Sequence, residues 1–157
     1  MRAVKVDAGR TPLEFSLTHR LRDDLQVGMK YDAVKEDFSP LVNWRILEAT
    51  PSRPAVAVGI SSSWPLDDDG GGMLFVTAAQ LLGERISGSA SLSFGLKDDK
   101  FRTPASLSYT FTDSFSATLF HDGKKLHPLV TFDRAPGSLS LILLRGEDPA
   151  ISMSWGF

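Results

Sequence analysis

The sequence contains no cysteine, which excludes disulfide bonds, thiolate metal sites and cysteine nucleophiles. No apolar run approaches the roughly 18 to 20 residues that a membrane-spanning helix requires. Acidic and basic residues nearly balance, with a formal net charge of -2, so there is no basic field that could hold phosphates. Nucleic acid is therefore not expected as a partner.

The length and composition indicate one folded domain. A chain of 157 residues with 42% hydrophobic residues is too apolar for a disordered protein, and no long linker divides it. We therefore expect a single domain over residues 1–157. Residues 1–7 lack the apolar stretch and cleavage site of a signal peptide. If the protein is exported, we expect this sequence to be its mature or recombinant form.

Strict alternation of apolar and polar residues dominates the chain and is typical of strands with two different faces. In residues 25–32, Leu25, Val27, Met29 and Tyr31 alternate with polar residues or glycine. Helical spacing with caps is hard to find. Only residues 76–82 are compatible with a helical turn, and they suit a strand as well. The pattern recurs at 86–96, 106–111, 115–121, 138–143 and 151–157.

Turn-forming residues separate these runs at short intervals and set the strand count. The spacing predicts strands of about nine to eleven residues, the length that a tilted strand needs to cross a bilayer. We predict an all-β fold, a single antiparallel up-and-down β-barrel of about 12 strands, with ten as the alternative. The turn signals lie at 8–10, 22–24, 35–37, 51–54, 65–72, 83–84, 97–99, 112–114, 122–123, 136–137 and 146–148.

An internal repeat supports this layout. Residues 17–32 align without a gap on residues 107–122, an offset of 90, and residues 40–44 align on 128–132, an offset of 88. Each unit comprises a strand, a tight turn with Asp, a second strand and a third that begins with Pro-Leu-Val. Repeated hairpins build up-and-down barrels, although any two amphipathic hairpins resemble one another.

The polar face indicates which side of the wall meets water. It consists mostly of serine, glycine, alanine and threonine, while charges concentrate in the turns. Small groups suit a concave interior and bulky apolar groups suit a lipid-facing exterior, so we expect a barrel of the outer-membrane type. The alternative is a soluble β-barrel with reversed faces that binds an apolar ligand inside. Aromatics expected in interfacial girdles are Tyr31, Trp44, Trp64, Tyr109, Trp155 and Phe157.

The turns also divide by parity into two sets, as expected for the two rims of such a barrel. One set holds the charged loops at 35–37, 67–72, 97–99, 122–125 and 146–148. The other holds the compact turns at 23, 83–84, 113 and 136–137.

Residues 54–60, 121–124 and 151–157 resemble the repeated hairpins of YjbH-like outer-membrane barrels, which are associated with bacterial exopolysaccharide. The resemblance is one of layout over about residues 12–157. It implies a role in surface polysaccharide production or export, with membrane lipid, the barrel insertion machinery and polysaccharide as partners. Trp155 and Phe157 match the alternating apolar positions and terminal aromatic of the signal that the insertion machinery reads, whereas Ser152 replaces the glycine expected earlier in it.

Reactive chemistry is sparse, so we expect a non-enzymatic pore or scaffold in the bacterial outer membrane, without metal or cofactor. The histidines His19, His121 and His127 lack zinc-site spacing, and the absence of a Gly-x-Ser-x-Gly elbow argues against a lipase or acyltransferase. The acidic run 67–69 lacks the ligand spacing of a calcium loop.

Three cations fall on the small-residue face and are candidates for lining the lumen: Arg20, Lys30 and Arg45. There they could bias a passage towards anions. Alternatively, they could form ion pairs with Glu14 or Asp32 that brace the wall.

Overall fold

The structure, a computed structural model, describes residues 2–4, 13–62 and 72–156. These residues form strands joined by loops and turns, and no helix occurs among them. None of the described segments is a helix long and apolar enough to cross a membrane. The strands are β1 (Arg2–Val4), β2 (Leu13–Arg22), β3 (Leu25–Asp32), β4 (Asp37–Leu47), β5 (Ala55–Ser62), β6 (Gly72–Leu81), β7 (Ile86–Gly95), β8 (Phe101–Arg102), β9 (Ala105–Thr112), β10 (Phe115–His121), β11 (Leu126–Arg134), β12 (Gly137–Leu144) and β13 (Asp148–Trp155).

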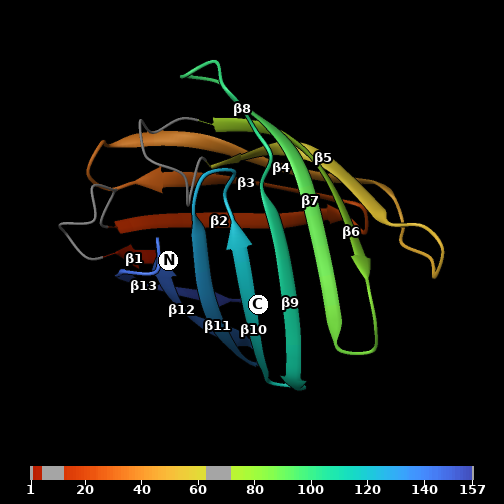
Figure 1. Cartoon of the computed structure of the whole chain (residues 1–157). Helices are drawn as coiled ribbons and strands as arrows, with labels where there is room; N and C mark the ends of the chain where they lie inside the picture. Colours follow the sequence, from red (N-terminus) through yellow and green to blue (C-terminus); the bar gives the residue numbers. More distant parts are fainter. Residues whose placement is uncertain (1, 5–12, 63–71, 157) are drawn as a thin grey trace.

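The strands form one antiparallel ring (Figure 1). Each strand pairs with its neighbours in the chain, except that β8 and β9 both pair with β7 and not with each other. In addition, β1 pairs with β13, and β6 pairs with β7 from Met73↔Gly95 to Leu81↔Ser87. This last pairing joins the two ends of the strand order, so the sheet closes on itself. The predicted all-β, antiparallel up-and-down barrel is confirmed, and residues 76–82, compatible with a turn of helix, lie largely in β6.

The thirteen strands occupy twelve positions around the wall, because β8 and β9 lie in line beside β7 and share one position. β7 pairs with β8 through Phe94↔Phe101 and with β9 through Ala90↔Ala105 in the same register. Between them, the amide of Ser91 donates to the carbonyl of Pro104 at 2.8 Å. Proline has no amide hydrogen for the ladder, so the strand is interrupted between β8 and β9 at 103–104. The predicted count of about 12 strands is thus confirmed.

The connections lie on two rims, as the parity of the turns predicts. The turn rim carries 23–24, 48–54, 82–85, 113–114 and 135–136, and the loop rim carries 33–36, 96–100, 122–125 and 145–147. Three turn-rim connections have two residues. The connection 48–54 is longer and contains a separate Thr50↔Arg53 bridge. Residues 5–12 and 63–71, including the acidic run 67–69, lie outside the described residues.

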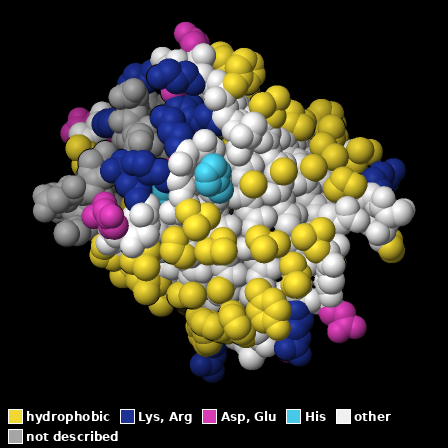
Figure 2. Space-filling view, in the orientation of Figure 1, with side chains coloured by type: hydrophobic (Ala, Val, Ile, Leu, Met, Phe, Trp, Pro, Cys, Tyr) yellow, Lys and Arg dark blue, Asp and Glu magenta, His cyan; other side chains and the backbone are white. Residues whose placement is uncertain are grey.

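Most large apolar side chains point outward, as the small residues of the opposite face predict. Along β12, Leu141 and Leu143 are 49% and 40% exposed, whereas Ile142 and Leu144 are 3% and 0% exposed. Figure 2 shows hydrophobic side chains in rows over the visible wall, with charged ones mostly towards its edges. Exposed apolar residues in the middle of the strands include Leu17, Met29, Val76, Leu92, Leu107, Leu119, Val130, Leu141 and Ile151.

Aromatic side chains gather towards both ends of this apolar surface. Tyr31 contacts Phe38 and Phe94 contacts Phe101 near the loop rim, with ring centroids 4.7 and 4.9 Å apart. Near the turn rim, Phe111 contacts both Tyr109 and Phe115.

Two tryptophans extend this turn-rim band. The indole N–H of Trp44 donates to Asp24 at 3.0 Å and lowers the pKa of that carboxyl. Trp155, at the end of β13, is 69% exposed. Two aromatic bands flanking an aliphatic middle are typical of membrane-facing barrels. Trp64 and Phe157 lie outside the described residues.

The sequence repeat corresponds to equivalent hairpins. β2 and β3 match β9 and β10, and each pair contains a register shift that skips one residue, Leu21 in the first and Phe111 in the second. The same backbone contact follows each turn. The amide of Arg45 donates to the carbonyl of Asp24, and the amide of Asp133 donates to the carbonyl of Ser114, both at 2.8 Å. The offset of 90 therefore relates equivalent β-bulges as well as equivalent strands.

The position of Gly59 leaves no room for a side chain. A Cβ at Gly59 would lie 1.8 Å from the carbonyl oxygen of Val42 and 3.1 Å from the Phe75 ring, so a side chain cannot fit without moving the backbone. We predict that Gly59→Ala lowers the free energy of unfolding by roughly 2 kcal/mol. Gly83→Ala is the matched control, because no atom lies within 4 Å of its added Cβ. Equal urea midpoints for the two variants would contradict this.

Candidate functional site

The interior wall is lined by hydroxyl groups that hydrogen-bond across neighbouring strands. Ser89 contacts Ser106 and Ser108 contacts Thr118, each pair at 2.7 Å. The same arrangement joins Thr77 to Ser91, Thr131 to Ser140 and Ser138 to Ser154. Cross-strand hydroxyl pairs stabilise a sheet and satisfy polar groups inside it. The serine and threonine rows of the sequence thus form a polar inner surface.

The interior is packed at the loop rim. Most of the buried residues of the described chain lie near this rim, and they include an apolar cluster of Ile142, Leu144 and Ala150 with Leu129 against it. The buried polar and charged residues of the described chain share this location: Glu14, Lys30, Asp32, Ser39, Ser93, Asp122 and His127. Such packing leaves little room for an aqueous channel at this end of the barrel.

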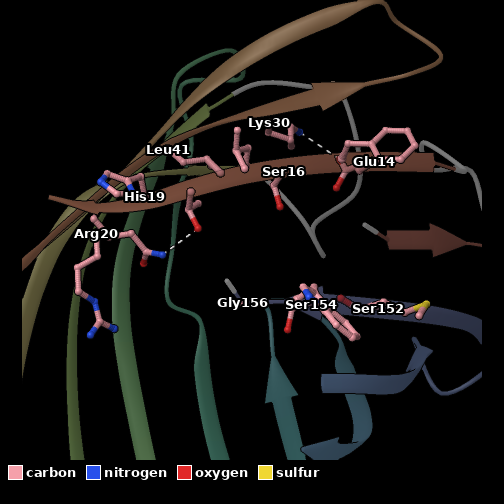
Figure 3. A pocket seen from close by; sticks show the side chains of 15 residues that line it. Glu14, Ser16, His19, Arg20, Lys30, Leu41, Ser152, Ser154 and Gly156 are labelled. Carbon is pink, nitrogen blue, oxygen red and sulfur yellow. Dashed lines mark hydrogen bonds and ion pairs between the residues drawn. The ribbon is translucent and has the colours of Figure 1, made fainter. Parts of the chain in front are cut away.

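One buried ion pair is part of this packing. Lys30 Nζ lies 3.1 Å from Glu14 Oε1, and both side chains are nearly inaccessible (Figure 3). The pairing Glu14↔Asp32 places a second carboxylate beside them. The contact with Glu14 matches the wall-bracing role that the sequence allows Lys30, and both residues also line the larger cavity beside β2.

A second polar contact closes the loop between β10 and β11. Asp122 Oδ2 lies 2.8 Å from His127 Nε2, and His127 Nδ1 accepts from the amide of Arg145 at 3.1 Å. Because Nδ1 is an acceptor, we assign the ring proton to Nε2, which donates to Asp122.

The other Asp122 oxygen accepts from the amides of Lys124 and Lys125. Burial opposes the charged form of Asp122, but the hydrogen bonds from Lys125, His127 and Lys124 outweigh it and lower its pKa. At the same rim, the Arg102 guanidinium binds Asp98 and lowers the pKa of that carboxyl. The loop rim is thus held by paired charges.

The interior is more accessible towards the turn rim. Arg20 and Arg45 lie there on inward positions, as predicted, and line a cavity of about 230 Å³ with Gln26, Asn43 and Thr77. Arg45 pairs with Glu48 at 2.9 Å and donates to the carbonyl of Asp23. No ion pair joins Arg20 to an acidic residue of the described chain. Asp23 and Asp24 line the same cavity, so the vestibule at the turn rim carries both positive and negative charges.

The described part of β1 is shorter than the strands on either side of it. This strand pairs with β13 over three residues and with β2 over two, whereas β2 is 10 residues long and β13 is 8. Beyond Arg2, β2 and β13 face each other across a cavity of about 780 Å³ (Figure 3). We call this space, lined by Ser16, Thr18 and Arg20 of β2 and by Ser154 and Gly156 of β13, the gap beside β1.

The histidines and the insertion signal are placed as follows. His121 ends β10 and His127 lies in β11 near the loop rim, while His19 lies in the middle of β2. Among the residues with described positions, no group of three His, Cys, Asp or Glu could hold a metal ion. Trp155 lies at the exposed end of β13, and its companion Phe157 falls outside the described part.

The sequence did not reveal the Asp122–His127 contact or the gap beside β1. For the contact, the only signal is an Asp-Gly turn with a histidine five residues after its aspartate. The gap depends on the length of β1, which alternation alone does not define.

Comparisons with family models, curated proteins and solved structures find no match for this chain. The YjbH-like resemblance therefore stays a prediction.

Substitutions of Lys30 and Arg45 compare the buried ion pair near the loop rim with the exposed ion pair near the turn rim. Lys30→Met leaves the Glu14 carboxylate buried without the ammonium group, so we expect the free energy of unfolding to fall by about 3 kcal/mol. Arg45→Met removes an exposed pair and should cost less than about 1 kcal/mol. Urea unfolding followed by circular dichroism measures both, and an equal loss would show that the Glu14–Lys30 pair does not brace the wall.

Proposed function

We propose that this chain is a non-enzymatic β-barrel of the bacterial outer membrane that acts as a scaffold. The observation that carries the proposal is the outer surface: large apolar side chains face outward around the ring, between two aromatic bands. Contiguous exposed apolar surface of this extent is unfavourable in water and matches the hydrocarbon core of a bilayer. Membrane lipid is thus the first proposed partner.

The interior supports a scaffold over an open pore. The Glu14–Lys30 and Asp122–His127 contacts and the apolar cluster around Leu144 fill the loop-rim end. A soluble barrel that binds an apolar ligand would need large apolar side chains along its interior, whereas hydroxyl pairs line much of this one. In a scaffold, the vestibule at the turn rim provides a polar surface with charges of both signs that faces one side of the membrane.

Two further parts of the proposal come from β13 and from the layout of the hairpins. The exposed Trp155 at the end of β13 suits recognition by the barrel insertion machinery, which makes that machinery a proposed partner. The resemblance of the layout to YjbH-like barrels supports a proposed role in surface polysaccharide production or export, with polysaccharide as cargo or neighbour.

Refolding with and without detergent tests the membrane assignment. We expect the urea-unfolded chain to regain β circular dichroism only with micelles, because the apolar surface then meets detergent. The folded form should migrate differently on a gel before and after heating. A detergent-free monomer with β circular dichroism would contradict the proposal.

A charge placed on the outer surface tests the same point within the folded protein. Leu141 lies in the middle of β12 and is 49% exposed. Leu141→Arg should lower the free energy of unfolding from vesicles by about 2–4 kcal/mol, because arginine is unfavourable at the bilayer midplane. Leu82→Arg, at the 65% exposed Leu82 of a turn-rim connection, is the control and should have little effect.

In water, both changes would replace an exposed leucine and should each alter stability by less than about 0.5 kcal/mol. A neutral Leu141→Arg in vesicles would therefore show that β12 does not face lipid.

A further inference from the structure

The outer surface of the barrel contains an apolar groove over β9 to β12, which we call the outer groove. Small side chains form its floor. Ala117 lies between Tyr109 of β9 and Val130 of β11, and Pro128 lies opposite Leu119. The larger residues around them enclose a cavity of about 390 Å³ with a mostly apolar lining. This volume lies within the range of roughly 300–1,000 Å³ that is common for sites of small organic ligands.

The outer groove extends from the turn rim into the apolar middle of the wall. At the turn rim it begins at Ile86, the first residue of β7, which pairs with Tyr109. On its far side it reaches Leu141, in the middle of β12. In a bilayer, this course leads from the level of the lipid head groups towards the hydrocarbon core.

One basic side chain lies at the turn-rim end of the outer groove. Arg85 directly precedes Ile86. Its carbonyl accepts from the amide of Thr110 at 2.9 Å, and its guanidinium donates to the carbonyl of Phe111 at 3.5 Å. The residue is exposed, and no ion pair links it to an acid of the described chain. Most of the five guanidinium N–H donors therefore stay available to a ligand.

Two acidic residues flank Arg85. Glu84 precedes it in the same turn, and Asp113 follows Phe111 in the turn after β9; both are exposed, and neither forms an ion pair with Arg85. The contact of Phe111 with Phe115 belongs to the aromatic band of the turn rim. Such bands lie at the level of the head groups. A head group at this end of the groove would therefore meet one cation and two anions.

We propose that the outer groove binds one phospholipid with an ammonium head group, such as phosphatidylethanolamine. One acyl chain lies in the groove, the phosphate pairs with Arg85, and the ammonium group faces Glu84 and Asp113. This inference rests on the proposed membrane location, because only in a membrane does the groove meet lipid chains.

The groove and the charges contribute different parts of the binding. A chain in the groove contacts side chains on both sides, whereas a chain on a flat wall contacts side chains on one side only, so dispersion attraction favours the groove. Charge-assisted hydrogen bonds from Arg85 to the phosphate then fix the head group. Phosphatidylglycerol would keep the phosphate contact, but it lacks the ammonium group that compensates for Glu84 and Asp113. The site therefore favours phosphatidylethanolamine over phosphatidylglycerol with the same chains.

Native mass spectrometry tests the site on the full chain, folded in micelles and titrated with dioleoyl phospholipids. We expect saturable retention of one phosphatidylethanolamine per chain, and about threefold weaker retention of phosphatidylglycerol, the value of one exposed ion pair. Inorganic phosphate should not compete, because it has no chain to occupy the groove. Equal retention of the two lipids, or retention of many lipids without saturation, would overturn the proposal.

Variants of two outward alanines locate the acyl chain. Ala117→Phe fills the floor of the groove, so we expect at least about tenfold weaker retention of phosphatidylethanolamine. Ala117→Leu fills less of the groove and serves the same purpose if the phenyl ring prevents folding. Ala90→Phe is the matched control, because Ala90 of β7 is exposed and lies outside the groove. Unchanged retention in the Ala117 variants, or an equal loss in Ala90→Phe, would exclude the groove as the site.

Variants of two arginines locate the phosphate. Arg85→Gln removes one cation at the membrane surface, so we expect about fivefold weaker retention of phosphatidylethanolamine. Arg134→Gln is the matched control and should leave retention unchanged. Arg134 is also exposed and without an ion pair in the described chain, but it ends β11 away from the groove. Equal losses in the two variants would indicate a general effect of charge and overturn the role of Arg85.

The result separates this proposal from the membrane assignment. Folding in micelles without selective lipid retention would overturn the lipid site alone. Folding only in detergent-free buffer would overturn the membrane location, and the lipid site with it, since water would then cover the groove.

Discussion

The alternation of side-chain direction along each strand is the constraint on which the rest of this structure depends. The closed ring satisfies most backbone groups within the wall, so side chains alone determine what each surface meets. Large apolar groups occupy the outward positions, as at Leu141, and hydroxyls or small groups occupy most inward ones, as at Ser140. A shift of one residue in register would exchange the two surfaces. The register of each strand therefore determines which residues face outward.

Inside the wall, the two ends of the barrel differ. Buried charge pairs such as Glu14–Lys30 are tolerated at the loop rim because hydrogen bonds and opposite charges compensate for the loss of water. Towards the turn rim, Arg20 and the gap beside β1 stay accessible. The structure thus combines a packed end that gives rigidity with a more accessible end.

Much of the fold could be predicted from the sequence because period-two alternation and turn residues are local signals. The bounds of β3 and β10 and the equivalence of the repeated hairpins all follow from them. The short β1 could not be predicted, since pairing of the chain ends is a long-range property. Parity placed Lys30 on the inward face, but it could not decide between an open lumen and the ion pair, which depends on the position of Glu14 across the ladder.

The most direct test of the orientation is the accessibility of nitroxide labels along β12 in vesicles, and the absence of native cysteine makes single labelling straightforward. Labels at positions 138 to 143 would be compared for collision with oxygen, which enriches in lipid, and with a water-soluble nickel complex. The account predicts high oxygen access at 139, 141 and 143 and low oxygen access at 138, 140 and 142. The opposite parity, or access to the nickel complex at 139, 141 and 143, would contradict it.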